Sequence, residues 1–155
     1  MIASAWKQEG EAEMEKLLGS WDLVDWYRLA ADGSRTPNGG SNPAGRLTYS
    51  ADGTMHAIIV ASGRPSPVDM NISAEDKVKL FETLLAYSGT FRVEAGRVIH
   101  RVDVSWNGLW TGQDLIRLFE LHDNTLRITT EPSRDLYDGT TNVYVVDWVK
   151  TVTKM

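Results

Sequence analysis

Polar and apolar residues alternate along the stretch Tyr87–Trp106, which consists of two runs joined by Ala95-Gly96. Such alternation is typical of β-strands that bury one face, and a two-residue link ending in glycine is typical of a tight hairpin. A two-residue loop pairs Glu94 with Arg97 and thereby sets the register of the whole hairpin. The face that results is apolar except for one histidine, and the opposite face is mostly charged. The pairs expected on the apolar face are Val93 with Val98, Phe91 with His100, Gly89 with Val102, and Tyr87 with Val104.

The same alternation predicts six further strands in the rest of the chain. They cover Ser20–Leu29, Arg46–Ser50, Thr54–Ala61, Asp114–His122, Thr125–Glu131 and Asn142–Val149. Gly53 and Asp123-Asn124 mark the turns of two more hairpins. Between Ala30 and Gly45 the chain is rich in turn-forming residues, which favours a long loop of the kind that borders an entrance.

These strands place a second set of residues on the inner face. The pairs expected there are Tyr49 with Met55, Leu47 with Ala57, Leu121 with Leu126, Phe119 with Ile128, and Arg117 with Thr130. The first and last strands add Trp21, Leu23, Asp25, Tyr27, Tyr144, Val146 and Trp148. His56 is expected on the outer face.

Two helices are predicted, one between strands and one before the first strand. Ser73 and Asp76 have the spacing of a capping box, and the helix that follows is predicted to run from about Ala74 to Ala86. Its expected apolar face comprises Val78, Phe81, Leu84 and Leu85. A short N-terminal helix is predicted at about Glu11–Leu18, and the residues that could form its apolar stripe are Trp6, Met14, Leu17 and Leu18. We expect residues 1–17 to act as a lead-in or lid over one end of the fold.

Eight long strands in simple succession predict an all-β fold, an eight-stranded antiparallel up-and-down barrel, because closure removes both exposed edges. A barrel of this size can enclose one small ligand. The chain length of 155 residues predicts a single domain over 1–155. Within it, the barrel is expected to cover 18–150.

Composition narrows the range of functions that the protein could have. A formal net charge of −5 and the scattered basic residues argue against nucleic-acid binding. The absence of cysteine excludes disulfides and cysteine-based metal sites. No apolar run approaches the ~18 residues of a membrane helix, and the first residues do not resemble a secretory signal, so we expect a cytoplasmic protein that is a monomer or a homodimer. Six tryptophans and five tyrosines suit a pocket for a small apolar or aromatic ligand.

Several segments together resemble a known family. They are GSWDLVDW at the start of the first strand, GRLTYSADGTMHA, AYSGTFRV, HRVDVSWNGLW and the closing VDWVK. Over Leu18–Lys150 this pattern is similar to the lipocalin-like domain family of bacteria and fungi, which are single barrels of this length. The resemblance implies either a carrier or a cofactor-free enzyme such as a cyclase, isomerase or lyase, because the fold alone does not decide between them.

His100 is the sharpest chemical candidate. Within an apolar wall, desolvation lowers the pKa of an imidazole and leaves it neutral at pH 7, so His100 could act as a general base or acid. The alternative is a core histidine that is hydrogen-bonded to a neighbour. A haem-binding barrel through His100 is a further alternative.

Arg117 is the second candidate, because an inward arginine needs a negative partner. Asp25 could supply that charge in an internal salt bridge. Otherwise the partner would be a carboxylate, phenolate or enolate of the ligand, and Arg117 would stabilise the oxyanion. Tyr87 is the tyrosine expected to donate a hydrogen bond beside it. The other residues expected to line the ligand site are Tyr49, Met55, Phe91, Val102, Trp106, Trp110, Phe119, Tyr144, Asp25 and Tyr27.

No metal site and no cofactor are expected. His56 and His122 are predicted to face outward, and phosphate-loop, nucleophile-elbow and HExxH motifs are absent. The sequence thus favours a cofactor-independent isomerisation, cyclisation or elimination on a small apolar or aromatic substrate. The alternative is a non-catalytic carrier that uses the same cavity.

Overall fold

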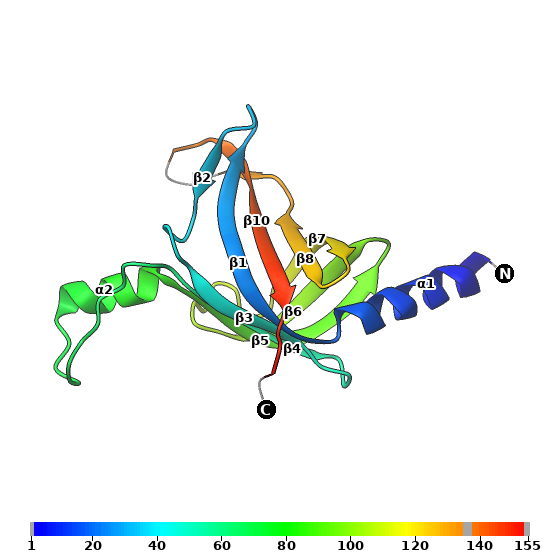
Figure 1. The fold of residues 1–155 in the computed structure, drawn as a ribbon, viewed down its shortest axis with the longest axis horizontal. Coiled ribbons are helices and arrows are strands. Elements are labelled where there is room, and N and C mark those ends of the chain that lie inside the picture. Colours follow the sequence, from blue (N-terminus) through cyan, green and yellow to red (C-terminus); the bar gives the residue numbers. More distant parts are fainter. Residues whose placement is uncertain (1, 135–137, 154–155) are drawn as a thin grey trace.

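The computed structural model describes residues 2–134 and 138–153, and within these it shows two helices and ten strands (Figure 1). The helices are α1 (Ile2–Leu17) and α2 (Ala74–Glu82). The strands are β1 (Gly19–Ala30), β2 (Arg35–Pro37), β3 (Ala44–Tyr49), β4 (Thr54–Val60), β5 (Leu84–Glu94), β6 (Arg97–Ser105), β7 (Asp114–His122), β8 (Thr125–Thr130), β9 (Ser133–Arg134) and β10 (Thr141–Lys150).

The eight long strands form the expected closed antiparallel barrel. Successive strands from β3 to β8 pair with one another, β1 pairs with β3, β8 pairs with β10, and β10 pairs with β1 to close the sheet. The short strands β2 and β9 extend β1 and β10 at one end of the barrel. Closure leaves the long strands without an open edge, as the sequence predicts.

The central hairpin β5–β6 has the predicted turn and most of the predicted register. Ala95 and Gly96 both have positive φ angles, of 43° and 78°, which are typical of a two-residue type I′ turn. The pairs from Glu94–Arg97 to Gly89–Val102 are confirmed. The predicted pair of Tyr87 with Val104 is wrong, because a β-bulge next to Gly89 shifts the register and Tyr87 pairs with Ser105.

A second bulge lies in β1 and corrects the predicted faces of that strand. Leu23 pairs with Trp148 and Asp25 pairs with Asp147, so Val24 is the extra residue and is 58% exposed. Beyond the bulge the inward positions change from odd to even numbers. Trp26 therefore packs against the core, whereas Asp25 and Tyr27 lie on the outer face.

The two other predicted hairpins are confirmed. In β3–β4, Tyr49 pairs with Met55 and Leu47 pairs with Ala57, and His56 is exposed. In β7–β8, Arg117 pairs with Thr130. The pairs Leu121–Leu126 and Phe119–Ile128 also form as predicted.

Helix α2 begins as predicted but ends early. The Ser73 hydroxyl accepts a hydrogen bond from the Asp76 backbone N–H at 3.1 Å. Thr83 ends the helix, and the two leucines that follow enter β5, where Leu84 pairs with Val60. The predicted apolar face is therefore wrong: it is split between two elements, and the part left on α2, Val78 and Phe81, is 54% and 50% exposed.

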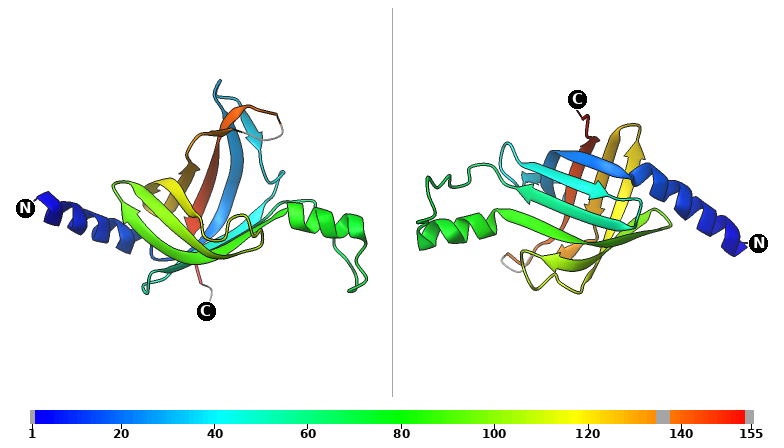
Figure 2. Two further views of the ribbon diagram at one scale, coloured as in Figure 1. Left: turned by 180° about the vertical axis from the view of Figure 1, so that it is seen from behind. Right: turned by 90° about the horizontal axis from the view of Figure 1, so that it is seen from below.

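Both helices point away from the barrel, on opposite sides (Figures 1 and 2). Helix α1 starts earlier than predicted, and only its last turn covers the barrel end. Leu17 is fully buried there, and the carbonyl oxygen of Leu17 accepts a 2.9 Å hydrogen bond from the Trp21 indole. Met14 and Leu18 pack against the same core. The side chain of Trp6, which is part of the predicted stripe, lies outside the described residues.

The core fills the end of the barrel next to α1. Trp21, Tyr49, Met55, Leu126 and Leu17 are almost completely buried in it. The inward row of β4 continues from Met55 through Ala57 to Ile59, which leads from this packed end into a hollow half of the barrel. Among the described residues, no helix is both long and apolar enough to cross a membrane.

Candidate functional site

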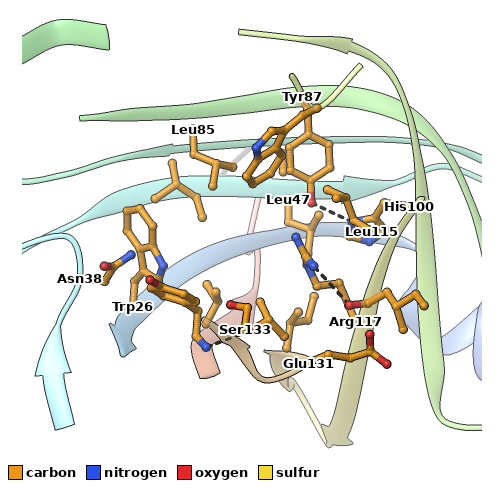
Figure 3. Close-up of a pocket in the computed structure, with 18 of the residues that line it drawn as sticks. Trp26, Asn38, Leu47, Leu85, Tyr87, His100, Leu115, Arg117, Glu131 and Ser133 are labelled. Carbon is orange, nitrogen blue, oxygen red and sulfur yellow. Dashed lines mark hydrogen bonds between the residues drawn. The ribbon is translucent and has the colours of Figure 1, made fainter. Parts of the chain in front are cut away.

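The hollow half of the barrel is a cavity of about 670 Å³ (Figure 3). Its size falls within the range of small-molecule sites in proteins. Most of its wall is apolar or aromatic. Its aliphatic side chains, tryptophans and proline are Trp26, Leu47, Ala57, Ile59, Leu85, Trp110, Leu115, Ile116, Ile128, Pro132, Val146 and Trp148.

Exposed residues mark where the cavity meets solvent. Asn38, which follows β2, and Glu131–Ser133, at the junction of β8 and β9, are exposed and line the cavity. The segments β2 and β9 thus border the entrance. The expected loop between Ala30 and Gly45 does lie there, although it contains the strand β2, and the backbone N–H of Asn38 donates to the carbonyl oxygen of Trp26 at 2.9 Å.

A buried group of three hydrogen-bonded side chains lies at the wall of the cavity. His100 on β6 is 1% exposed, and both of its ring nitrogens are engaged. The Tyr49 hydroxyl lies 2.8 Å from Nε2, and the Tyr87 hydroxyl lies 2.8 Å from Nδ1. Because β3, β5 and β6 all contribute to this group, barrel curvature rather than sequence proximity brings it together.

The electrostatics of the group are those of a buried neutral site. Desolvation, and next the positive charge of Arg117, lower the pKa of His100 to about 3. Burial raises the pKa of Tyr49 and of Tyr87, and Arg117 acts in the opposite direction on both hydroxyls. At pH 7 the imidazole and both phenols are therefore neutral.

Arg117 lies in the cavity wall on β7, with its guanidinium beside the Tyr87 hydroxyl (Figure 3). Its Nη1 donates to the carbonyl oxygen of Ile116 at 3.2 Å. Among the described residues, no carboxylate forms an ion pair with it. The alternative partner Asp25 is wrong, because the bulge in β1 turns Asp25 outward, where it pairs with Arg35.

An aromatic row continues from Tyr87 toward α2. The rings of Tyr87 and Trp110 are 5.6 Å apart between centroids, and Trp110 meets Trp106 edge-on at 5.1 Å. Phe81 of α2 lies 6.2 Å from Trp106. Trp110 lines the cavity, whereas Trp106 packs behind it and does not.

Of the predicted site residues, the structure brings five to the cavity wall: His100, Arg117, Tyr87, Trp110 and Tyr144. Tyr49 stands behind His100. The predicted ligand contacts Met55, Phe91, Val102 and Phe119 pack in the core instead of lining the cavity. Asp25 and Tyr27 lie outside the barrel, where the guanidinium of Arg35 covers the Tyr27 ring at 3.7 Å from its centroid.

Sequence reasoning missed several lining residues. Alternation from Trp21 predicts that Trp26 faces outward, and helical spacing predicts Leu85 on a helix. Asn38 lies in the segment that is predicted to be a loop. All three residues line the cavity. Leu115 could have been found, since it shares the inward row of β7 with Arg117. No group of three or more His, Asp or Glu residues within the described part of the chain could hold a metal ion. Neither ring nitrogen of His100 is free to bind a haem iron in this arrangement.

A closed eight-stranded barrel with one packed end and a ligand-sized cavity in its other half defines the class of lipocalin-like barrels. Residues 18–151 match the lipocalin-like domain family, so most of the chain belongs to that family. Such a barrel suggests small-molecule binding. Comparison with curated proteins and with solved structures gives no match.

Proposed function

We propose that the chain binds, in this cavity, a small apolar or aromatic molecule that carries a carboxylate, phenolate or enolate oxygen. The observation that supports the proposal is Arg117, a guanidinium in the cavity wall with which no carboxylate of the described residues forms an ion pair. Removing a charged group from water costs several kcal/mol unless an opposite charge meets it. A ligand oxyanion would supply that charge in a charge-assisted hydrogen bond.

The rest of the wall fits the remainder of such a ligand. Trp26, Trp110 and Trp148 offer flat apolar surfaces at different points of the cavity. In the described part of the chain, the carboxylates on the wall are Asp114 and Glu131, and both are exposed. We therefore expect the aromatic or aliphatic body of the ligand to lie against these rings, with its oxygen at Arg117 and Tyr87.

Catalysis in the same cavity is the second candidate function. The juxtaposition of Tyr87 and Arg117 favours it, because two donors aimed at one oxygen stabilise a developing enolate. An isomerisation, cyclisation or elimination would use such a site. His100 as the general base stays a prediction, and its geometry is unfavourable: both nitrogens are hydrogen-bonded, and a pKa of about 3 makes a weak base at pH 7.

Two fluorescent probes with the same aromatic body test the proposal. 1-Anilinonaphthalene-8-sulfonate carries an anionic group, whereas N-phenyl-1-naphthylamine has none. We expect the wild-type chain to bind both and each to displace the other. Arg117→Met should weaken binding of the sulfonate about tenfold or more and leave the amine within twofold, since a hydrogen bond to a charged group contributes about 1.5–3 kcal/mol.

Arg46→Met is the matched control. Arg46 lies on β3 outside the cavity and pairs with Asp22, so its loss removes one positive charge without touching the wall. Both probes should bind this variant as they bind the wild type. The proposal is wrong if neither probe binds the wild type, or if Arg117→Met binds the sulfonate undiminished.

A further inference from the structure

We infer that Tyr49 and His100 act as positioning residues that turn the hydroxyl hydrogen of Tyr87 into the cavity. The site therefore binds a ligand group that accepts a hydrogen bond and excludes a ligand group that can only donate one. The arrangement Tyr49–His100–Tyr87 carries the inference. Its consequence for ligands rests on the proposed function, whereas the position of the protons does not.

The protons of the three groups can be counted. A neutral imidazole has one N–H donor and one acceptor nitrogen, and each phenol has one O–H. His100 therefore donates to one tyrosine and accepts from the other. Two arrangements satisfy this rule, and they differ in which phenol keeps a hydrogen that the triad does not use.

In the first arrangement Nε2–H donates to Tyr49, and Tyr87 donates to Nδ1. The O–H of Tyr49 would then lack an acceptor, because His100 is its hydrogen-bonding partner in the structure. Tyr49 is 1% exposed and packs against Phe91, whose ring centroid is 4.7 Å away. An unsatisfied buried donor costs about 1–3 kcal/mol, which disfavours this arrangement.

In the second arrangement Tyr49 donates to Nε2, and Nδ1–H donates to the Tyr87 hydroxyl. Every donor of the buried part is then satisfied, and only oxygen lone pairs of Tyr49 stay unused. The hydrogen left over belongs to Tyr87, which lines the cavity and can use water or a ligand as its acceptor. The geometry thus assigns the proton of His100 to Nδ1.

This assignment determines what the cavity recognises. The Tyr87 O–H and the guanidinium of Arg117 lie side by side in the wall, and both are donors (Figure 3). A ligand oxygen with free lone pairs satisfies both. A ligand group that only donates would leave the Tyr87 O–H without an acceptor and would meet a second donor in the guanidinium, and sites of this kind discriminate strongly between such ligands.

The first experiment identifies the protonated nitrogen of His100 by long-range ¹H–¹⁵N correlation NMR at pH 7. His56→Gln and His122→Gln assign the other two rings, which are exposed. We expect the His100 proton on Nδ1, with Nε2 as a hydrogen-bond acceptor. A proton on Nε2, or a mixture of the two forms, overturns the inference.

The second experiment tests whether the Tyr87 hydroxyl donates a hydrogen bond into the cavity, by comparing the binding of two uncharged ligands. 2-Acetylnaphthalene carries a carbonyl oxygen where 2-isopropenylnaphthalene carries a methylene group of similar shape. Displacement of N-phenyl-1-naphthylamine should show that the wild type prefers the ketone about three- to tenfold, as one neutral hydrogen bond implies. Tyr87→Phe should reduce this preference to what Arg117 alone provides, while still binding the alkene.

The outcomes separate the two proposals. If His100 is protonated on Nδ1 but no probe enters the cavity, the proton assignment holds and the proposed function fails. If the probes bind but the ketone preference is absent from the wild type or is undiminished in Tyr87→Phe, the inference about recognition fails and the proposed function stands.

Discussion

For Gly89, the sequence predicts the position in the barrel correctly but the role of the glycine wrongly. From the sequence it faces inward beside His100, where the absence of a side chain would leave room for a ligand. In the structure a Cβ atom at Gly89 would lie 1.8 Å from the carbonyl oxygen of Arg101 on β6. The backbone of the bulged hairpin therefore occupies the space, and glycine serves the close approach of the two strands.

Replacing Gly89 by alanine should thus destabilise the barrel. Arg101 contributes backbone rather than a flexible side-chain end, so the two strands would have to separate locally. We expect Gly89→Ala to lower the free energy of unfolding by about 1–3 kcal/mol, the usual range for overpacking, as measured by urea denaturation. Gly108→Ala is the control, because nothing lies within 4 Å of a Cβ at that position. Equal stability of the two variants would contradict the explanation.

The polar residues of the site were predictable one at a time but not as a group. Alternation along single strands placed His100, Arg117, Tyr49 and Tyr87 on the inner face, and all four are there or directly behind it. That two phenols converge on one imidazole depends on the curvature and stagger of the closed sheet. Neither property can be derived from the residue pattern, so the hydrogen bonds of His100 could not be foreseen.

At the level of elements, the β1 bulge limited what the sequence could predict. Strict alternation from Trp21 leads to Tyr27 inside, yet one extra residue at Val24 reverses the faces beyond it. A bulge adds a residue without any composition signal of its own. Within this one strand, the prediction that Trp21 faces inward is therefore correct, whereas the same prediction for Asp25 and Tyr27 is wrong.

The predicted extent of helix α2 is wrong for a different reason, which is competition between local and non-local structure. The spacing of Val78, Phe81, Leu84 and Leu85 fits a helical face. Leu84 and Leu85 instead pair with β4 in the sheet, and Leu85 contributes to the cavity wall. Burial in the barrel outweighs helix periodicity at these positions, because tertiary packing routinely overrides local propensity.

The β5–β6 turn offers a stabilising substitution. Ala95 has a φ angle of 43°, in the left-handed region that disfavours residues with a Cβ. Asparagine tolerates this conformation and is favoured before glycine in type I′ turns. We expect Ala95→Asn to raise the free energy of unfolding by about 1 kcal/mol in urea denaturation. Ala51→Asn, in the β3–β4 turn, should change it by less than about 0.5 kcal/mol, because Ala51 has no positive φ angle.

For the whole molecule, strand count and simple succession were enough to predict closure, and the β1–β10 pairing confirms it. The division of the interior into a packed end and a hollow half was not predicted. It arises because large side chains such as Trp21, Tyr49 and Met55 fill the end next to α1, while Ala57 and Ile59 continue the β4 row into the cavity. The polar group of His100 lies at this boundary, so its protonation is coupled to the stability of the entire barrel.

This coupling predicts acid sensitivity with a definite sign. In the unfolded chain His100 takes up a proton below its ordinary pKa of about 6.5, whereas in the fully buried folded state its pKa is about 3. The unfolded state therefore binds more protons between these values, and the free energy of unfolding falls as the pH falls, by up to about 1.4 kcal/mol per pH unit. From pH 6 to pH 4, the wild type should lose about 2–3 kcal/mol more stability than His100→Gln, measured by urea denaturation at each pH.

His56→Gln should follow the wild type, because His56 is exposed on the outer face. Parallel losses in the wild type and His100→Gln would mean that His100 titrates in the folded barrel and that its surroundings are wetter than the buried tyrosine pair implies.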